Sequence, residues 1–532
     1  MKARGLVLLP VVLFVLAGGC VTKVDHGRGT VIVAGEMKQW HDVVLTFDGP
    51  QADEAGAPNP FLDYRLDVTF AKGEKQYVVP GYYAADGHPG QTSAAAGNKW
   101  QVHLLPPEPG TWTYRVSFRT GTDVAIDGGG GVPVASADGL TGTITIGATD
   151  KTGRDFHAQG LLRYTGQRYL QFAHTGTYFL KGGADSPENF LGYADFDQTY
   201  DTAELKRTGE AAGEKFIHQY QPHLGDWRPG DPTWQGDKGK GIIGALNYLA
   251  SKGMNSVYFL TYNIDGGDGQ DVWPWTSPTE KLRFDCSKLA QWEIVLSHMD
   301  RLGLALHVVT QETENDQGLD GGDLGRQRKL YYRELIARFA HHPALVWNLG
   351  EENTNTTEQR KAFAQYLHDL DPYDHPVVCH TFPGKYDEVY GPLLGYKHFE
   401  GPSLQTNDTH RQTMKWIDLS VKADRPWFVC LDEIGPSHTG VKPDNDDFWH
   451  DEARAHHLWG NLMAGGAGCE WYFGYNFPND DLNCESWRSR DHLWDMTRYA
   501  LGFFRDYLPF AKMSHHDELT STPDDYCFAD PG

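Results

Sequence analysis

In the N-terminal part of the chain, apolar and polar residues alternate in short runs. Alternation with a period of two predicts β-strands that bury one face. Turn residues separate the runs, as in Pro106–Gly110. Regular spacing of short strands and turns predicts an all-β sandwich over residues 21–150. The expected strands are 30–35, 43–48, 63–70, 76–83, 99–105, 111–119 and 142–146.

From about residue 155 the pattern changes to continuous apolar runs alternating with helical stripes. Leu289, Trp292, Val295 and Met299 recur at helical spacing before Gly303. An uninterrupted apolar run is typical of a parallel strand buried on both faces. Eight such units predict a (β/α)8 TIM barrel over residues 151–510, so the fold class is α/β with a preceding sandwich. The expected barrel strands are 178–181, 256–261, 304–309, 344–349, 376–380, 397–400, 427–431 and 468–472.

The two ends of the chain have their own patterns. Lys2 and Arg4 precede an apolar run, and small residues then lead to Cys20. This pattern predicts a lipoprotein signal peptide over residues 1–20, with Cys20 lipidated; simple secretion is the alternative. We therefore expect an exported protein, anchored by lipid in the bacterial outer membrane or periplasm. Residues 511–532 either close the barrel domain or begin a truncated C-terminal β-module.

Composition narrows the classes of partner. A net charge of −24 argues against nucleic acid, whose binding needs clustered cations. No two cysteines have the CxxC spacing of a zinc site, although a disulfide at Cys286 or Cys484 remains open. The segment 266–271 resembles one calcium-binding nonapeptide fragment, but such sites need stacked repeats. We therefore expect no metal and no cofactor.

Two apolar strands end abruptly at carboxylates. One delivers Glu352, and the other delivers Glu433, 81 residues later. Active sites of β/α barrels lie at the carboxyl ends of the strands. Glycosidic bond cleavage needs two facing carboxyl groups, one as acid/base and one as nucleophile or base. Helix capping or ion pairing by the same residues is the structural alternative.

The segments around these carboxylates resemble a known group of enzymes. Residues 347–353 read Trp-Asn-Leu-Gly-Glu-Glu-Asn, and residues 432–435 read Asp-Glu-Ile-Gly. They look like the strand-four and strand-seven signatures of clan A glycoside hydrolases. The resemblance implies a retaining mechanism with Glu352 as acid/base and Glu433 as nucleophile. Glu351 stands where the clan has an Asn that contacts the sugar 2-hydroxyl, so either Glu351 accepts that hydroxyl or the two glutamates exchange roles. Alternation along a strand predicts that Asp432 points away from Glu433.

The whole chain resembles bacterial proteins with a DUF5060-type sandwich and an apiosidase-like or DUF4038-like barrel. Some members are labelled collagen-binding or collagenase-like, but no His-Glu-x-x-His helix supports a peptidase here. The resemblance implies a plant or algal polysaccharide, or its oligosaccharides, as substrate. A non-catalytic surface glycan-binding lipoprotein is the alternative. The expected substrate contacts are Asp265, Trp273 and Trp275 on the loop after strand two, His307, His380, and Trp471 as an aromatic floor.

Overall fold

Two antiparallel sheets form the N-terminal domain. The computed structural model describes residues 21–25, 30–202, 217–264, 271–522 and 525–530. One sheet has the order β1-β2-β3-β7-β6, with strands Thr22–Asp25, Thr30–Gly35, Val43–Asp53, Ala96–Leu104 and Tyr82–Tyr83. The other has the order β10-β8-β4-β5, with strands Thr141–Ile146, Gly110–Thr120, Tyr64–Lys72 and Lys75–Pro80, and β9 (Val132–Pro133) pairs with β8.

The alternating pattern explains why these sheets pack face to face. Along β8, every second side chain is buried, from Trp112 to Phe118. The buried faces meet across the sandwich, where the Trp100 and Phe118 rings contact edge to face with centroids 4.9 Å apart. Burial of large aromatic side chains supplies most of the stabilisation of such a domain.

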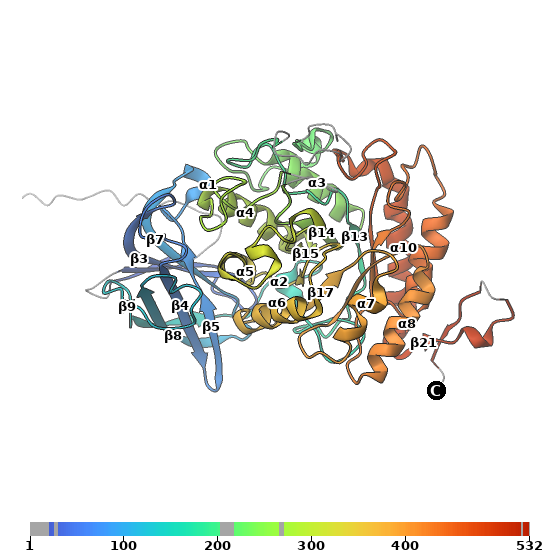
Figure 1. Ribbon diagram of the computed structural model, residues 1–532, viewed down its shortest axis with the longest axis horizontal. Helices are drawn as coiled ribbons and strands as arrows, with labels where there is room; N and C mark the ends of the chain where they lie inside the picture. The colour runs from blue at the N-terminus through green and yellow to red at the C-terminus, as the bar shows by residue number, and fades with distance from the viewer. Residues whose placement is uncertain (1–20, 26–29, 203–216, 265–270, 523–524, 531–532) are drawn as a thin grey trace, which may run out of the picture.

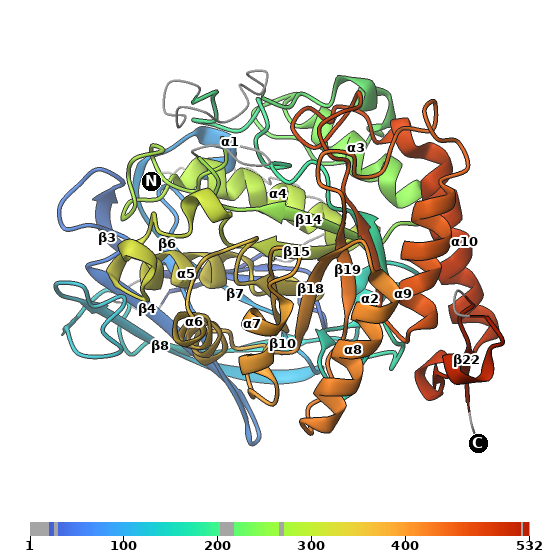
Figure 2. The ribbon, with the colours of Figure 1, turned by 45° about the vertical axis from the view of Figure 1, so that its right-hand side comes forward.

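Eight parallel strands close into a barrel in chain order, which confirms the predicted fold class. The strands are β13 (Lys181–Ala184), β14 (Ser256–Leu260), β15 (Ala305–Val309), β16 (Leu345–Asn348), β17 (Val377–His380), β18 (Gly401–Thr406), β19 (Cys430–Ile434) and β20 (Gly468–Trp471). Helices surround them in Figures 1 and 2. The longer ones are α3 (Lys240–Ser251), α4 (Cys286–Leu302), α5 (Arg326–Phe339), α6 (Thr357–Leu370), α8 (Thr409–Lys422) and α10 (Asp491–Tyr507), and the short ones are α1 (Pro89–Thr92), α2 (Phe156–Gln159), α7 (Tyr386–Val389) and α9 (Trp459–Met463).

Three barrel strands lie later in the chain than predicted: the first, the sixth and the seventh, which begins at Cys430 rather than residue 427. The first begins at Lys181 and consists of Lys-Gly-Gly-Ala. A Cβ at Gly183 would lie 2.0 Å from the Ser256 carbonyl oxygen, so only glycine allows this approach of β14. The sixth is Gly401–Thr406, whose small and polar residues lack an apolar signal. Residues 397–400 are instead a loop, in which the Glu400 carboxylate accepts the Val377 N–H at 2.8 Å.

The barrel helix α5, yellow in Figure 1, packs against the blue strands of the sandwich. Arg333 donates to Asp67 Oδ1 at 2.8 Å and to the Leu66 carbonyl oxygen at 3.0 Å. The Leu105 N–H donates to the Tyr373 hydroxyl at 2.7 Å. These buried hydrogen bonds join the two domains into one packed unit.

Smaller elements complete the fold. Strands β11 (Leu162–Arg163) and β12 (Gln171–Phe172) pair with each other, as do β21 (Ser514–His515) and β22 (Phe528–Ala529). The C-terminal segment contacts α8 through His410, whose Nε2 lies 2.6 Å from Asp517 Oδ2. Cys286 and Cys484 are buried free thiols rather than disulfide partners. Within the described residues, no helix combines the length and the apolar character needed to cross a bilayer.

Candidate active site

Three buried side chains converge at the carboxyl ends of strands β16, β17 and β19. One ligand-capable atom of each of Glu351, His380 and Glu433 lies within 4.8 Å of the others. His380 Nε2 is 3.3 Å from Glu433 Oε2. On the opposite side of the ring, His380 Nδ1 lies 3.2 Å from the Tyr258 hydroxyl, which donates to Glu351 Oε2 at 2.8 Å. We call Glu351, His380 and Glu433 the carboxylate–histidine trio.

A β-bulge on β19 sets the direction of Glu433. The register with β18 runs from Leu404–Leu431 to Gln405–Glu433, which leaves Asp432 as an extra residue. A bulge breaks the alternation of side chains along a strand. Glu433 therefore joins the trio while Asp432 also points inward, where it forms an ion pair with Lys181. The prediction that Asp432 points away was wrong for this reason.

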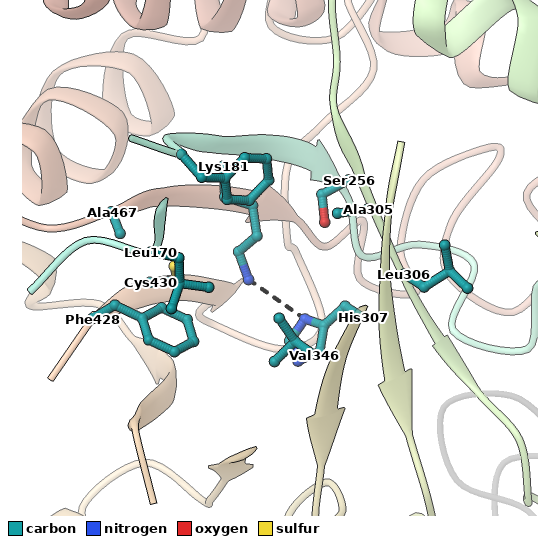
Figure 3. A pocket seen from close by; sticks show the side chains of 11 residues that line it. Leu170, Lys181, Ser256, Ala305, Leu306, His307, Val346, Phe428, Cys430 and Ala467 are labelled. Atoms are coloured by element: carbon teal, nitrogen blue, oxygen red, sulfur yellow. Dashed lines mark hydrogen bonds between the residues drawn. The ribbon is translucent and has the colours of Figure 1, made fainter. Parts of the chain in front are cut away.

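A second polar cluster lies inside the barrel, near the amino ends of the strands (Figure 3). Lys181 lies 2.9 Å from Glu470 Oε2 and pairs with Asp432. Burial opposes ionisation of Glu470, but the charges of Lys181 and His307 lower its pKa to about 2. Glu470 is thus a buried anion that Lys181 and His307 hold inside the barrel.

His307 belongs to this interior cluster and not to the barrel mouth. Its Nδ1 lies 2.8 Å from Glu470 Oε2, and its Nε2 lies 3.1 Å from Asn348 Nδ2. Both ring nitrogens therefore have protein partners. The predicted substrate contact through His307 was wrong, because strand β15 carries this side chain into the packed interior.

Asp185 was not predicted and lies among the glutamates. It follows β13 directly, and its carboxyl group is buried without a hydrogen-bond partner among the described residues. Burial raises its pKa well above the usual range, and the charges of Glu351 and Glu433 raise it further. The neutral form of Asp185 is therefore favoured more than in an ordinary aspartate. Its position directly after a barrel strand could have identified Asp185 as a site residue. The prediction missed it because the strand was expected to end at residue 181, whereas β13 ends at Ala184.

A cavity of about 290 Å³ opens beside the trio. Glu352 lines it, half-buried, with a left-handed backbone at φ 44°. Residues in this region are uncommon outside glycine and cluster at functional sites. The cavity lining combines polar and aromatic groups from the ends of strands β16 to β20: Glu352, Phe382, Pro383, Gln405, Thr406, Asn407, Gly435, Pro436, Ser437 and Tyr475.

Trp471 is not the floor of this cavity. Its indole N–H donates to the Thr497 hydroxyl on α10 at 2.9 Å. Since Glu470 points inward, its strand neighbour points outward into the helix layer. Tyr475, five residues after Glu470, and Phe382 are the aromatic residues in the described lining of the cavity. The predicted aromatic floor was therefore placed on the wrong side chain.

The two tryptophans after β14 are packed inside the protein. Trp273 is 1% exposed, and Lys288 Nζ lies 4.3 Å from its ring centroid. Trp275 is fully buried and contacts Tyr262 edge to face at 4.8 Å. Neither forms an open sugar subsite, contrary to prediction. Asp265 lies outside the described residues.

Comparisons with known proteins agree with this architecture. Residues 36–119 match the family described as domain of unknown function DUF5060. A protein of Bacteroides vulgatus, described as a "putative glycoside hydrolase", has 17% sequence identity and a TM-score of 0.59, covering 88% of this chain and 78% of its own. This likeness shows the fold.

Two further solved structures are similar at lower scores. A glycoside hydrolase family 5 protein of Bacteroides vulgatus has 12% identity and a TM-score of 0.45, over 70% of this chain and 78% of its own. A family 5 mannosidase mutant of Rhizomucor miehei, in complex with mannosyl-fructose, has 9% identity and a TM-score of 0.44, over 67% and 100%. Among curated proteins, none is similar to this chain in sequence.

Proposed function

We propose that the protein is a retaining glycoside hydrolase. The observation that carries the proposal is the gathering of Glu351, Glu352 and Glu433 at the barrel mouth, where either Glu351 or Glu352 supplies the second carboxyl group. An oxygen of Glu351 lies within 4.8 Å of one of Glu433, and Glu352 lines the adjoining cavity. Retaining enzymes hold their two carboxyl groups about 5–5.5 Å apart, whereas inverting enzymes keep them about 6.5–9.5 Å apart to admit water.

In this proposal Glu433 is the nucleophile. Its carboxylate attacks the anomeric carbon and forms a glycosyl-enzyme, while the leaving oxygen takes a proton from the acid. Water then attacks the same carbon, and the acid, now a base, accepts its proton. His380, 3.3 Å from Glu433 Oε2, orients the nucleophile and holds it in place.

Glu352 is the proposed acid/base. It is half-buried at the cavity wall, where a leaving group and solvent can reach it, while Glu351 is only 1% exposed. Glu351, held by the Tyr258 hydroxyl, is then the acceptor for the sugar 2-hydroxyl. Glu351 also lies close to Glu433, which supports the alternative in which Glu351 is the acid and Glu352 is not. Kinetic measurements distinguish these two assignments.

The test uses three matched variants, Glu433→Gln, Glu352→Gln and Glu351→Gln, each of which removes a charge at nearly constant volume. Substrates come from a panel of plant and algal glycans and aryl glycosides. Glu433→Gln should lose at least about 10³-fold in kcat with the fold intact. Turnover above a few per cent in that variant rejects the nucleophile assignment.

Aryl glycosides with good leaving groups identify the acid. Loss of the acid lowers turnover by about 10²–10⁴-fold for poor leaving groups, but far less for activated ones. Glu352→Ala should show this contrast and recover with azide, while Glu351→Ala should lose activity on both substrate types. The opposite pattern assigns the acid to Glu351. Binding to glycans without any turnover in the wild type favours the glycan-binding alternative.

We further propose that the protein is exported and anchored through lipid on Cys20. The support is the charged, apolar and small-residue order of residues 1–20. The full-length protein expressed in a Gram-negative host should fractionate with membranes, and Cys20→Ser should release it. Release of the wild type into the soluble fraction contradicts the anchor and favours simple secretion.

A further inference from the structure

A buried histidine–carboxylate cluster lies at the boundary between the sandwich and the barrel, away from the trio. Asp42 and His103 come from the sandwich, His103 from β7. His341 follows α5, and Glu293 lies on α4. Ligand-capable atoms of Asp42, His103 and His341 all lie within 4.8 Å of one another.

The distances within the cluster match those of a metal site. His103 Nδ1 is 2.9 Å from Asp42 Oδ2, and His341 Nε2 is 3.9 Å from the same oxygen and 3.2 Å from Glu293 Oε1. Zinc bonds of about 2.0–2.1 Å in tetrahedral geometry put ligand atoms about 3.3 Å apart. The observed separations lie on both sides of that value.

The carboxylates of the cluster have histidines as their charge partners. Among the described residues, no lysine or arginine forms an ion pair with Asp42 or Glu293. His341 is 3% exposed, and its Nδ1 has no partner among the described residues. Its Nε2 lies between Asp42 Oδ2 and Glu293 Oε1, so a cation placed there would contact both carboxylates and the ring.

Two other histidine–carboxylate clusters in the described part of the chain differ in this respect. Lys181 supplies a cation to the interior cluster of His307, Asp432 and Glu470. Lys38 and Lys151 do so for the cluster around Glu36. The boundary cluster combines two ligands from the sandwich with ligands from the barrel. Among the described residues, no lysine forms an ion pair with its carboxylates.

We propose that Asp42, His103 and His341 bind a divalent transition-metal ion, with zinc as the preferred ion, and that this ion joins the sandwich to the barrel. Two imidazoles and a carboxylate are ligands that suit zinc. Glu293, beside the same His341 nitrogen, or a water molecule takes the fourth position. Asp42 and Glu293 side chains are 26% and 20% exposed, which provides an entry path.

Neighbouring groups orient the proposed ligands. The Tyr82 hydroxyl lies 2.7 Å from His103 Nε2, so that Nδ1 is the nitrogen left for the metal. His342 Nε2 lies 3.2 Å from Glu293 Oε2, and its Nδ1 lies 2.7 Å from Asp300 Oδ2. Both ring nitrogens of His342 therefore have carboxylate partners, which leaves neither for the metal ion. This second shell resembles those that tune known metal sites.

The experiment uses the mature protein without a histidine tag, stripped with EDTA and titrated with zinc chloride. Bound zinc is measured by mass spectrometry after gel filtration, and the melting temperature is measured in parallel. The wild type should bind one equivalent and gain melting temperature. His341→Gln should lose more than about 100-fold in affinity, since second-shell changes alone cost about 10–100-fold.

His342→Gln is the matched control. His342 is the neighbouring histidine, it is also buried, and it lies outside the proposed ligand set. This variant should still bind one equivalent. Asp42→Asn, at a partly exposed position, replaces His341→Gln if that variant does not fold. Uptake of less than half an equivalent by the wild type overturns the proposal, as does unchanged uptake by His341→Gln or Asp42→Asn. Because the readout is metal content, failure here is independent of glycosidase activity.

Discussion

Replacing Lys181 with methionine should strongly destabilise the barrel. Lys181 is 6% exposed and pairs with Asp432 and Glu470, which are 1% and 0% exposed. Methionine keeps the length of the side chain but leaves both carboxylates without that ammonium group. Removal of one partner from a buried ion pair costs about 3–5 kcal/mol, because the remaining charge is uncompensated.

The pKa of Glu470 gives a second route to the magnitude. Its pKa falls from 4.5 to about 2 on folding. A lowering of this size corresponds to stabilisation on the order of a few kcal/mol at neutral pH. Lys181 is the largest source of that lowering. We therefore expect Lys181→Met to lower the free energy of unfolding by about 3–4 kcal/mol at pH 7.

The assay is urea-induced unfolding followed by far-UV circular dichroism and tryptophan fluorescence, in a double-mutant cycle with Glu470→Gln. The double variant should be more stable than the sum of the single effects implies, because it leaves fewer unpaired charges. A loss below about 1 kcal/mol for Lys181→Met refutes the reasoning, as do strictly additive effects.

The pH dependence has a definite sign. A carboxyl group with a lowered folded pKa contributes stability that is present above its unfolded pKa and lost as pH falls. The difference between the wild type and Lys181→Met should therefore be steady from about pH 5 to 7. It should shrink between about pH 4.5 and 2, where Glu470 takes up its proton. A difference that grows on acidification contradicts the assignment.

Three further predictions follow from the site. Asp185→Asn should raise the free energy of unfolding at pH 7, because the raised folded pKa of Asp185 makes folding less favourable as pH rises above the unfolded value. The gain should shrink toward pH 3, and urea midpoints at both pH values measure it. Trp471→Phe should leave KM within about twofold but lower stability, because the hydrogen bond to Thr497 is lost. Tyr475→Ala, which changes the cavity lining, should raise KM. A raised KM in Trp471→Phe would show that the Trp471 ring contacts the substrate. His380→Gln should lower kcat by about 10²-fold with little change in the urea midpoint, and equal loss of stability and activity indicates a purely structural role.

The architecture was largely predictable because it depends on local periodicity. Strand β8 alternates buried and exposed residues, as its sequence does. Strands β14, β15 and β16 are apolar throughout and start within one residue of the expected positions. Strand β18 escaped prediction, since Gly401 and Ser403 contribute little hydrophobic signal and its burial comes from neighbouring strands.

The site was predictable only in part. The strand-ending carboxylates predicted that Glu433 lies at the carboxyl end of a barrel strand near a second glutamate, and the structure places it beside Glu351. The bulge at Asp432 was not visible, because it arises from the register between β18 and β19. The place of Glu351 in the trio depends on the Tyr258 hydroxyl, 93 residues earlier in the chain. Packing likewise decided that Trp471 faces α10 rather than a substrate.

The sequence by itself determined which segments become strands and helices and that carboxylates end barrel strands four and seven. These properties follow from neighbouring residues, whose spacing decides which faces are buried. Only the tertiary structure decided which side chains meet: the trio, the Lys181 cluster and the boundary cluster of Asp42, His103 and His341. Their members are tens to hundreds of residues apart, so their distances depend on strand register and domain packing. No local pattern carries that information.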